Sequence, residues 1–254
     1  MVDEITIEKL RQKFLTELKT NGHNLYHESD VRRVTANDWE IKRFLIEYKS
    51  EDKAYQWMTT AFCWRKSFGV YDRSDQYFPK EFYELTEKEI TGRDRDGRLI
   101  QWECYRNDRS VDGFADLQKQ FMAHIVHQLD SRVGEDGCTI VSDIKNAGLI
   151  NVSYELMRFR MQLMQYYPLL ARRIIVLDLP FVLNAFTRLI MSLVSTSIQN
   201  RVAFIGRDEL PEFVDEDVIP VRFGGRRHEL GFPDGLRPLS NLKLLPLNAK
   251  QIDK

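Results

Sequence analysis

The sequence predicts an α/β protein in which a helical segment precedes a largely parallel sheet flanked by helices. Three observations support this fold class. Residues 1 to about 90 carry apolar residues at helical spacing. After them, short apolar runs typical of strands alternate with longer amphipathic segments, which is the order that builds a parallel sheet with helical crossovers. The last of these segments, residues 181–194, is unusually apolar for a crossover helix.

Composition limits the class of protein. A chain of 254 residues fits one large domain, or a domain with a helical annex. Its 37 basic and 38 acidic residues leave a net charge of −1, which argues against nucleic acid as a partner. Cys63, Cys104 and Cys138 lack metal-ligand spacing, and no secretory signal is visible, so we expect reduced thiols in a cytoplasmic protein. No window of eighteen apolar residues indicates a membrane span.

The first ninety residues predict a small helical lobe packed on a larger domain. Ile7, Leu10, Phe14 and Leu18 recur at helical spacing before a stop at Asn21-Gly22. Two more helices are expected over residues 39–48 and 54–64, each with several large apolar side chains.

The remaining elements follow from turn signals and apolar runs. Asp96-Gly97 is a strong hairpin signal, so a strand is expected to start at Leu99. Further strands are expected over residues 138–144, 174–177 and 202–206, and helices over 114–133 and 156–166. This alternation predicts right-handed crossovers between parallel strands.

The predicted helix over residues 181–194 has more apolar residues than a single packing face requires. They recur in pairs every four residues, and the polar positions Asn184, Thr187, Arg188 and Ser192 lie opposite. Such a stripe either packs on the sheet or covers something that is not protein. Because both arrangements bury the same stripe, a permanently packed helix and a removable lid both remain open.

Catalytic chemistry has little support. Asp143 and Asp178 lie near strand ends, where we expect them to bind loop backbone. His124, His127 and Asp130 share one loose helical face, and exposed polar residues of a helix explain them as well as a metal site does. The sequence contains no nucleophile elbow and no phosphate-cradling glycine loop. We therefore predict no catalytic residues, no metal and no enzyme activity.

Four short motifs follow one another in a fixed order along the second half of the chain. Tyr167-Pro168 precedes a strand, Pro180 opens the apolar helix, a strand ends at Gly206, and Pro220 precedes Gly224-Gly225. This order resembles the CRAL-TRIO lipid-binding family, which includes cellular retinaldehyde-binding protein, the α-tocopherol transfer protein and secretory phosphatidylinositol/phosphatidylcholine transfer proteins. The resemblance implies an N-terminal helical lobe (1–90), a CRAL-TRIO domain with an apolar gate helix (91–228) and an extended tail (229–254). Residues 39–70 and 152–168 look similar to the motile sperm domain-containing branch, whose members add a major-sperm-protein domain and a membrane anchor.

The resemblance implies a cytoplasmic protein that binds one lipid and transfers it between membranes, with no other cofactor. The expected pocket and gate residues are Phe181, Val182, Ala185, Phe186, Leu189, Ile190 and Leu193 of the apolar helix, and Ile140, Ser142, Ile175, Leu177 and Phe204 of the strands. The headgroup candidates are Arg201, Arg188 and Tyr48. At the family's phosphate-gripping positions only Arg201 keeps the chemistry, so we expect a different glycerophospholipid, or a less polar lipid, rather than phosphatidylinositol.

The implied partners are a lipid, a transiently contacted membrane surface and a membrane-tethering partner protein. Arg222, Arg226 and Arg227 form either a solvated basic face or a membrane contact. The alternative function is a non-transferring scaffold or membrane-contact adaptor whose pocket is degenerate. Large side chains filling the pocket would favour that alternative. Leucines of the tail, Leu239, Leu242, Leu244, Leu245 and Leu247, are expected to dock it on the domain.

Overall fold

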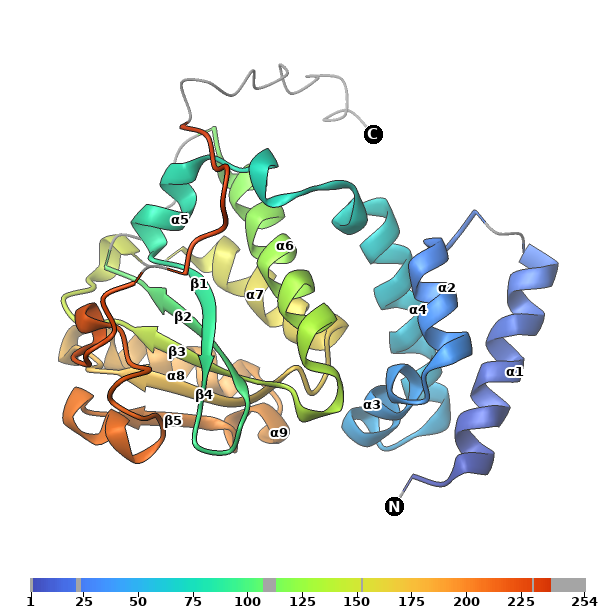
Figure 1. Ribbon diagram of the computed structural model, residues 1–254. Coiled ribbons are helices and arrows are strands. Elements are labelled where there is room, and N and C mark those ends of the chain that lie inside the picture. Colours follow the sequence, from blue (N-terminus) through green and yellow to red (C-terminus); the bar gives the residue numbers. More distant parts are fainter. Residues whose placement is uncertain (1, 22–23, 107–112, 152, 230, 239–254) are drawn as a thin grey trace.

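The computed structural model describes residues 2–21, 24–106, 113–151, 153–229 and 231–238. Its N-terminal part contains the helices α1 (Glu4–Asn21), α2 (Glu28–Ala36), α3 (Trp39–Tyr48) and α4 (Glu51–Ser67). They form a helical lobe beside the sheet-containing half of the molecule (Figure 1). Ile7, Leu10, Phe14 and Leu18 are all buried in the lobe, as their spacing predicted. The short helix α2 was not predicted.

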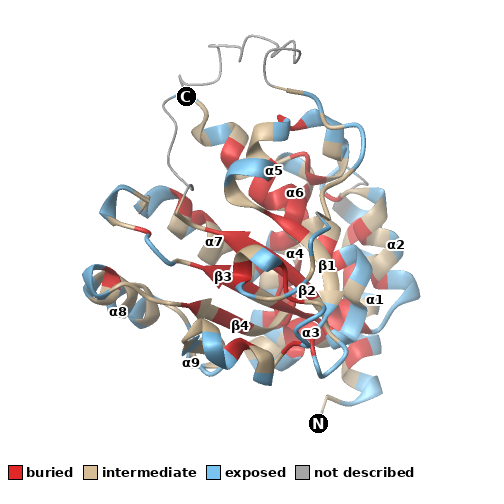
Figure 2. Ribbon diagram, turned by 60° about the vertical axis from the view of Figure 1, so that its left-hand side comes forward, coloured by how far each residue is buried: buried red, intermediate tan, exposed pale blue. Residues whose placement is uncertain are grey.

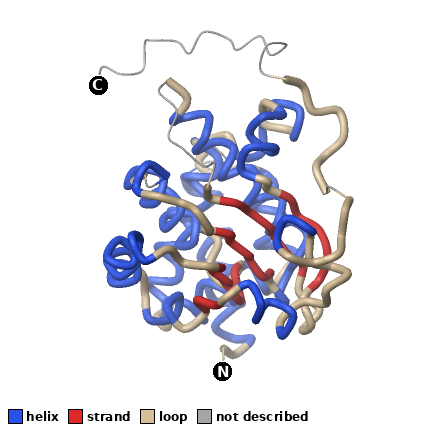
Figure 3. Tube along the Cα trace, turned by 90° about the vertical axis from the view of Figure 1, so that its left-hand side faces the viewer, coloured by secondary structure: helices blue, strands red, loops and turns tan. Residues whose placement is uncertain are grey.

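A mostly parallel sheet of five strands follows among the described residues, which confirms the predicted fold class. The strands are β1 (Glu89–Arg93), β2 (Leu99–Cys104), β3 (Cys138–Asp143), β4 (Ala171–Leu177) and β5 (Val202–Ile205), in that order across the sheet. Among the strands of the described residues, only β1 and β2 pair antiparallel. Figure 3 shows the strands as one twisted layer. The helices of this half are α5 (Lys80–Thr86), α6 (Ala115–Val133), α7 (Tyr154–Tyr166), α8 (Asn184–Leu193) and α9 (Thr196–Gln199).

The predicted hairpin joins β1 to β2 and is held by one buried carboxylate. Asp94 accepts hydrogen bonds from the backbone N–H groups of Asp96 (3.0 Å) and Arg98 (2.8 Å). Gly97 has a φ of +82°, which glycine adopts without steric cost. The acids of this turn therefore organise the backbone, and the strands leave it in the register that pairs Arg93 with Leu99.

Buried residues concentrate in the strands and in the helices packed on them, whereas the described residues of α8 are half-buried or exposed (Figure 2). One face of the sheet, with Ile100, Trp102 and Val141, packs against buried residues from the segment 207–223, among them Leu210 and Phe223. The other face is turned toward the side of α6 and α7, and it forms one wall of the cavity described below.

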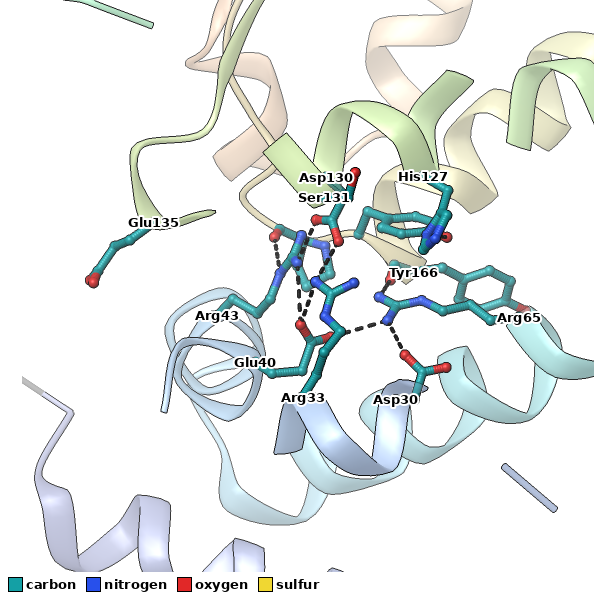
Figure 4. A network of polar contacts seen from close by, with 12 residues as sticks. Asp30, Arg33, Glu40, Arg43, Arg65, His127, Asp130, Ser131, Glu135 and Tyr166 are labelled. Carbon is teal, nitrogen blue, oxygen red and sulfur yellow. Dashed lines mark hydrogen bonds and ion pairs between the residues drawn. The ribbon is translucent and has the colours of Figure 1, made fainter. Parts of the chain in front are cut away.

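A buried network of charges joins the helical lobe to the rest of the molecule (Figure 4). It alternates three guanidinium groups with three carboxylates: Arg33, Arg43, Arg65, Asp30, Glu40 and Asp130. The α6 residue Asp130 bridges Arg33 (2.5 Å) and Arg43 (2.6 Å), whereas Arg65 binds Asp30 (2.7 Å) and Glu40 (3.1 Å). The charges balance, so no member is left buried without a counter-charge.

The same network grips the backbone that leads into β4. Arg65 donates to the carbonyl oxygen of Tyr166 (2.8 Å), and Arg43 donates to that of Pro168 (2.8 Å). Both guanidinium groups therefore tie the lobe to the Tyr-Pro segment as well as to α6. This arrangement gives a structural reason for the arginines of α3 and α4, which the sequence alone did not explain.

His127 lies beside the network and is expected to weaken the fold in acid. Burial, together with the nearby charge of Arg65, lowers its pKa to about 4. The unfolded chain protonates this ring near pH 6.5, so between pH 6.5 and 4 the unfolded state binds more protons and stability falls as the pH falls. Between pH 7.5 and pH 4.5, we expect the free energy of unfolding of His127→Gln to fall about 2–3 kcal/mol less than that of the wild type.

Chemical denaturation at pH 7.5 and pH 4.5 checks this expectation. The difference between wild type and His127→Gln isolates the histidine, because all other groups titrate in both proteins. His228→Gln is the matched control, since His228 is exposed. An identical pH dependence in wild type and His127→Gln would contradict the prediction.

The last described residues, 231–238, run along the domain surface. Phe232 and Leu236 pack on the cluster of Phe78 and Phe121, and the backbone N–H of Lys80 donates to the carbonyl oxygen of Arg237 (2.8 Å). The tail leucines from Leu239 onward lie outside the described residues. Among the helices of the described ranges, none is both long enough and apolar enough to cross a bilayer.

Candidate functional site

An apolar cavity of about 280 Å³ lies between the sheet and the helices α6, α7 and α8. Most of its wall is hydrocarbon. Its apolar lining includes Met122, Ile125, Val126, Leu129, Ile140, Leu156, Met157, Met161, Leu163, Met164, Ile174, Val176, Leu183, Phe186, Ile190, Met191, Val194, Val202 and Phe204. The volume is close to the lower end of the range of small-molecule sites, roughly 300–1,000 Å³. The cavity can hold an apolar group away from water.

Alternate residues of the strands form the sheet wall of this cavity. They are Gln101 and Glu103 of β2, Ile140 and Ser142 of β3, Ile174 and Val176 of β4, and Val202 and Phe204 of β5. Parallel pairing brings Ile140 beside Ile174 and Ser142 beside Val176. Successive side chains of a strand point to opposite faces, so each strand contributes every second residue. Ile140, Ser142 and Phe204, which were expected at a lipid pocket, therefore line the cavity.

Ile175 and Leu177 do not line the cavity, and their expected placement is wrong. Both are fully buried on the opposite face of the sheet, against Val141 and the segment that contains Leu210. A strand buried on both faces reads as a continuous apolar run, so its sequence cannot show which residues face which side. The cavity residues of β4 are instead Ile174 and Val176.

Some apolar residues of the segment 181–194 face the cavity and others face solvent. Its start is the turn Phe181–Leu183, and α8 follows after it. Phe186 and Ile190 face the cavity. Phe181, Val182, Ala185, Leu189 and Leu193 do not line it and are exposed, Phe181 at 90% and Leu189 at 52%. Since α8 contains no buried residue, it forms an outer wall of the cavity and is not part of a filled core.

The three headgroup candidates are not brought together. Arg201 lines the cavity, but its guanidinium already binds Glu47 (2.8 Å) and Ser197 (2.5 Å). Tyr48 is stacked on Trp57 and donates to a backbone carbonyl of α7 at 3.2 Å, and it does not line the cavity. Arg188 is exposed on α8.

A polar cluster that was missed by the sequence reasoning lies in the cavity wall. Glu103 accepts hydrogen bonds from Lys88 (2.8 Å), Gln101 (3.1 Å) and Ser142 (2.7 Å). Burial would raise the pKa of Glu103, but the charges of Lys88 and Arg160 outweigh it and lower the pKa to about 2. The carboxylate is therefore ionised at neutral pH. Its signal in the sequence was Gln101 and Glu103, two polar residues two apart in an otherwise apolar strand.

The residues considered for catalysis have structural partners. Arg207 links the two strand-end carboxylates, binding Asp143 (2.7 Å) and Asp178 (3.1 Å), and its backbone N–H donates to Asp178. The backbone N–H of Lys145 donates to Asp143, so both aspartates bind loop backbone as expected. Within the described ranges, no group of three or more His, Cys, Asp or Glu side chains could hold a metal ion. His124 instead binds Asp75 at 2.7 Å.

A sheet with one face on an apolar cavity that helices cover is an architecture suited to binding a hydrophobic molecule. The family model of the CRAL/TRIO domain matches residues 89–225, more than half of the chain, so this chain belongs to that family. Members of the family are lipid-binding and lipid-transfer proteins rather than enzymes. The crystal structure of Sfh5 is similar, with a TM-score of 0.65 at 14% sequence identity, covering 94% of each chain. This likeness shows the shared fold, including the helices before the matched domain.

Proposed function

We propose that this protein holds one lipid in the apolar cavity and transfers it between membranes, with α8 as the gate. The proposal rests on one observation: this apolar segment has apolar side chains both toward the cavity and toward solvent. Phe186 and Ile190 close the cavity, while Phe181 and Leu189 stand exposed on the other side. A helix that only completed a core would not expose a second apolar face.

The cavity wall accounts for lipid binding energetically. Each methylene that moves from water into such a wall contributes about 0.8 kcal/mol. The methionines Met157, Met161, Met164 and Met191 supply adaptable side chains that can follow an acyl chain. Opening requires α8 to move as a unit. Its C-terminal end is held by Gln199, which donates to the carbonyl oxygens of Met191 (2.8 Å) and Val194 (3.1 Å).

The exposed apolar residues around the lid fit a membrane surface. Besides those of the gate, Leu149 and Ile150 are exposed at 64% and 70% in the segment before α7. Ala147 and Asn151 of that segment also line the cavity, so both exposed groups adjoin the same cavity. In Figure 2 α8 projects at the edge of the molecule, away from the sheet. A bilayer reached through these side chains would receive the lipid directly.

The double variant Phe181→Asp/Leu189→Asp tests the membrane contact. Both side chains are exposed, so the fold and the cavity should persist, whereas a charge at the bilayer surface opposes insertion. We expect transfer of a fluorescent lipid between vesicles to slow at least about tenfold, since two apolar side chains that would enter the bilayer together contribute more than about 1.4 kcal/mol to membrane contact. Lipid occupancy, measured by native mass spectrometry, should stay unchanged.

Ser192→Asp is the control for this experiment. Ser192 is exposed on the same helix, so this variant adds a negative charge at a polar position without removing an apolar side chain. Transfer by Ser192→Asp should match wild type. Unaltered transfer by the double variant would refute a membrane-contacting gate.

The ligand of the proposed carrier is a glycerophospholipid or a less polar lipid, and phosphatidylinositol is disfavoured. Arg201, the one retained phosphate-binding position, is already paired with Glu47. Leu169 and Leu170, which follow Tyr167-Pro168 and line the cavity, are buried apolar residues that cannot bind a phosphate. The protein would act in the cytoplasm and touch membranes transiently. Native mass spectrometry of the purified protein with lipid extraction identifies the class, and an empty protein after incubation with mixed liposomes would refute carriage.

The alternative is a membrane-contact adaptor with a degenerate pocket. In this function the surface of the fold would bind a membrane-tethering partner protein. That function needs a pocket filled by large side chains. The cavity of about 280 Å³ therefore favours the carrier.

A further inference from the structure

The polar cluster in the cavity wall has hydrogen-bonding capacity that the protein does not use. Gln101 is 4% exposed, and its Nε2 donates to Glu103. Its Oε1 is buried and has no hydrogen-bond partner among the described residues. Reversing the amide would set Oε1 against the Glu103 carboxylate, so the present orientation is the favourable one. A buried acceptor without a partner is destabilising and calls for a donor.

Unused donors lie beside this acceptor. Lys88 is 5% exposed and donates to the same Glu103 oxygen as Gln101, at 2.8 Å. An ammonium group has three N–H donors, and within the described ranges Glu103 is the partner of only one. Glu103 cannot satisfy Gln101 Oε1, because an ionised carboxylate only accepts. The second Glu103 oxygen accepts from Ser142 at 2.7 Å.

We infer that the cavity takes a lipid whose head is an uncharged hydroxyl, such as a long-chain alcohol, a sterol or an acylglycerol. The hydroxyl donates to Gln101 Oε1 and accepts from Lys88. A hydroxyl is the smallest group that both donates and accepts, which is what these neighbouring side chains offer. The inference rests on the proposed carrier function and specifies its ligand.

Anionic heads fit this end of the cavity less well. A carboxylate or phosphodiester would accept from Lys88, but it has no proton for Gln101 Oε1 and it would lie close to the ionised Glu103. Arg160 also lines the cavity, with its guanidinium 4.3 Å from the centre of the Tyr105 ring. Its positive charge makes an anion the competing ligand that the experiment must include.

Three ligands with the same chain length separate these cases. Hexadecanol, methyl palmitate and palmitate are titrated against the full-length protein in competition with a fluorescent lipid. We expect hexadecanol to compete at concentrations at least about tenfold lower than either of the others, because a site built to bond a hydroxyl rejects an analogue that lacks it. This comparison uses the unaltered protein and needs no variant to fold.

A substitution at Gln101 tests whether this side chain causes the preference for the alcohol. Gln101→Met keeps a side chain of similar length and removes the acceptor, while Lys88 and Ser142 still bind Glu103. It should weaken hexadecanol about tenfold and leave methyl palmitate unchanged. Gln56→Met makes the same substitution at an exposed position of α4 that does not line the cavity, so it is the control and should preserve the preference for the alcohol.

Equal binding of alcohol and ester, or tightest binding of palmitate, overturns the inference and leaves lipid carriage standing. A preference for the alcohol that survives in Gln101→Met also overturns it. Failure of all three ligands, together with no vesicle transfer, overturns the carrier function itself.

Discussion

Replacing Asp130 by alanine is expected to lower the free energy of unfolding by about 3–5 kcal/mol. Asp130 is buried and accepts from both Arg33 and Arg43, so its loss leaves two buried guanidinium groups short of a counter-charge. Burial alone would raise the pKa of Asp130, but the charges of Arg43 and Arg33 hold it well below its usual range. The effect should therefore appear throughout the neutral pH range.

Urea unfolding of Asp130→Ala at pH 7 measures this loss. The matched control is Lys9→Met, because Lys9 and Glu51 form an ion pair that lies at the surface, at 2.5 Å. Exposed pairs contribute about 0–1 kcal/mol, so the control should remain close to wild type. A loss below about 1 kcal/mol in Asp130→Ala would show that the network does not hold the lobe in place.

Replacing Phe186 by aspartate is expected to empty the cavity. Phe186 is half-buried on the cavity side of α8, and a carboxylate there must either stay hydrated or force the lid open. Lipid occupancy and intermembrane transfer should both fall by at least about tenfold. The melting temperature should change little, since no residue of α8 belongs to the buried core.

Comparison with Phe181→Asp/Leu189→Asp separates the loss of membrane contact from the loss of lipid binding. The outward substitutions should slow transfer at unchanged occupancy, whereas the inward substitution should reduce both. Native mass spectrometry reports occupancy, and vesicle-to-vesicle fluorescence reports transfer. Full occupancy in Phe186→Asp would mean that α8 is not the wall of the lipid site.

The order of elements was readable from the sequence because it depends on local patterns. Helical spacing placed Ile7, Leu10 and Phe14 on one buried face, and the Asp96-Gly97 turn predicted the hairpin between β1 and β2. Alternating apolar runs and amphipathic segments then required a parallel sheet with helical crossovers. The short helix α2 lacked a comparable pattern and was missed.

The tertiary structure alone decided what lines the cavity. The apolar run of β4 has no polar alternation, so only packing shows that Ile174 faces the cavity while Ile175 faces the segment 207–223. The stripe of α8 is likewise apolar on both sides, and only its neighbours separate Phe186 from Leu189.

Contacts between distant residues explain the rest. Glu103 meets Ser142 across 39 positions of the chain, and Arg43 meets Asp130 across 87. Arg201, which was expected to bind a lipid headgroup, is instead paired with Glu47 of the helical lobe. A local pattern reports which face of an element is apolar, but the partner of a charge is set by the folded chain, because the two residues approach each other only after the elements pack.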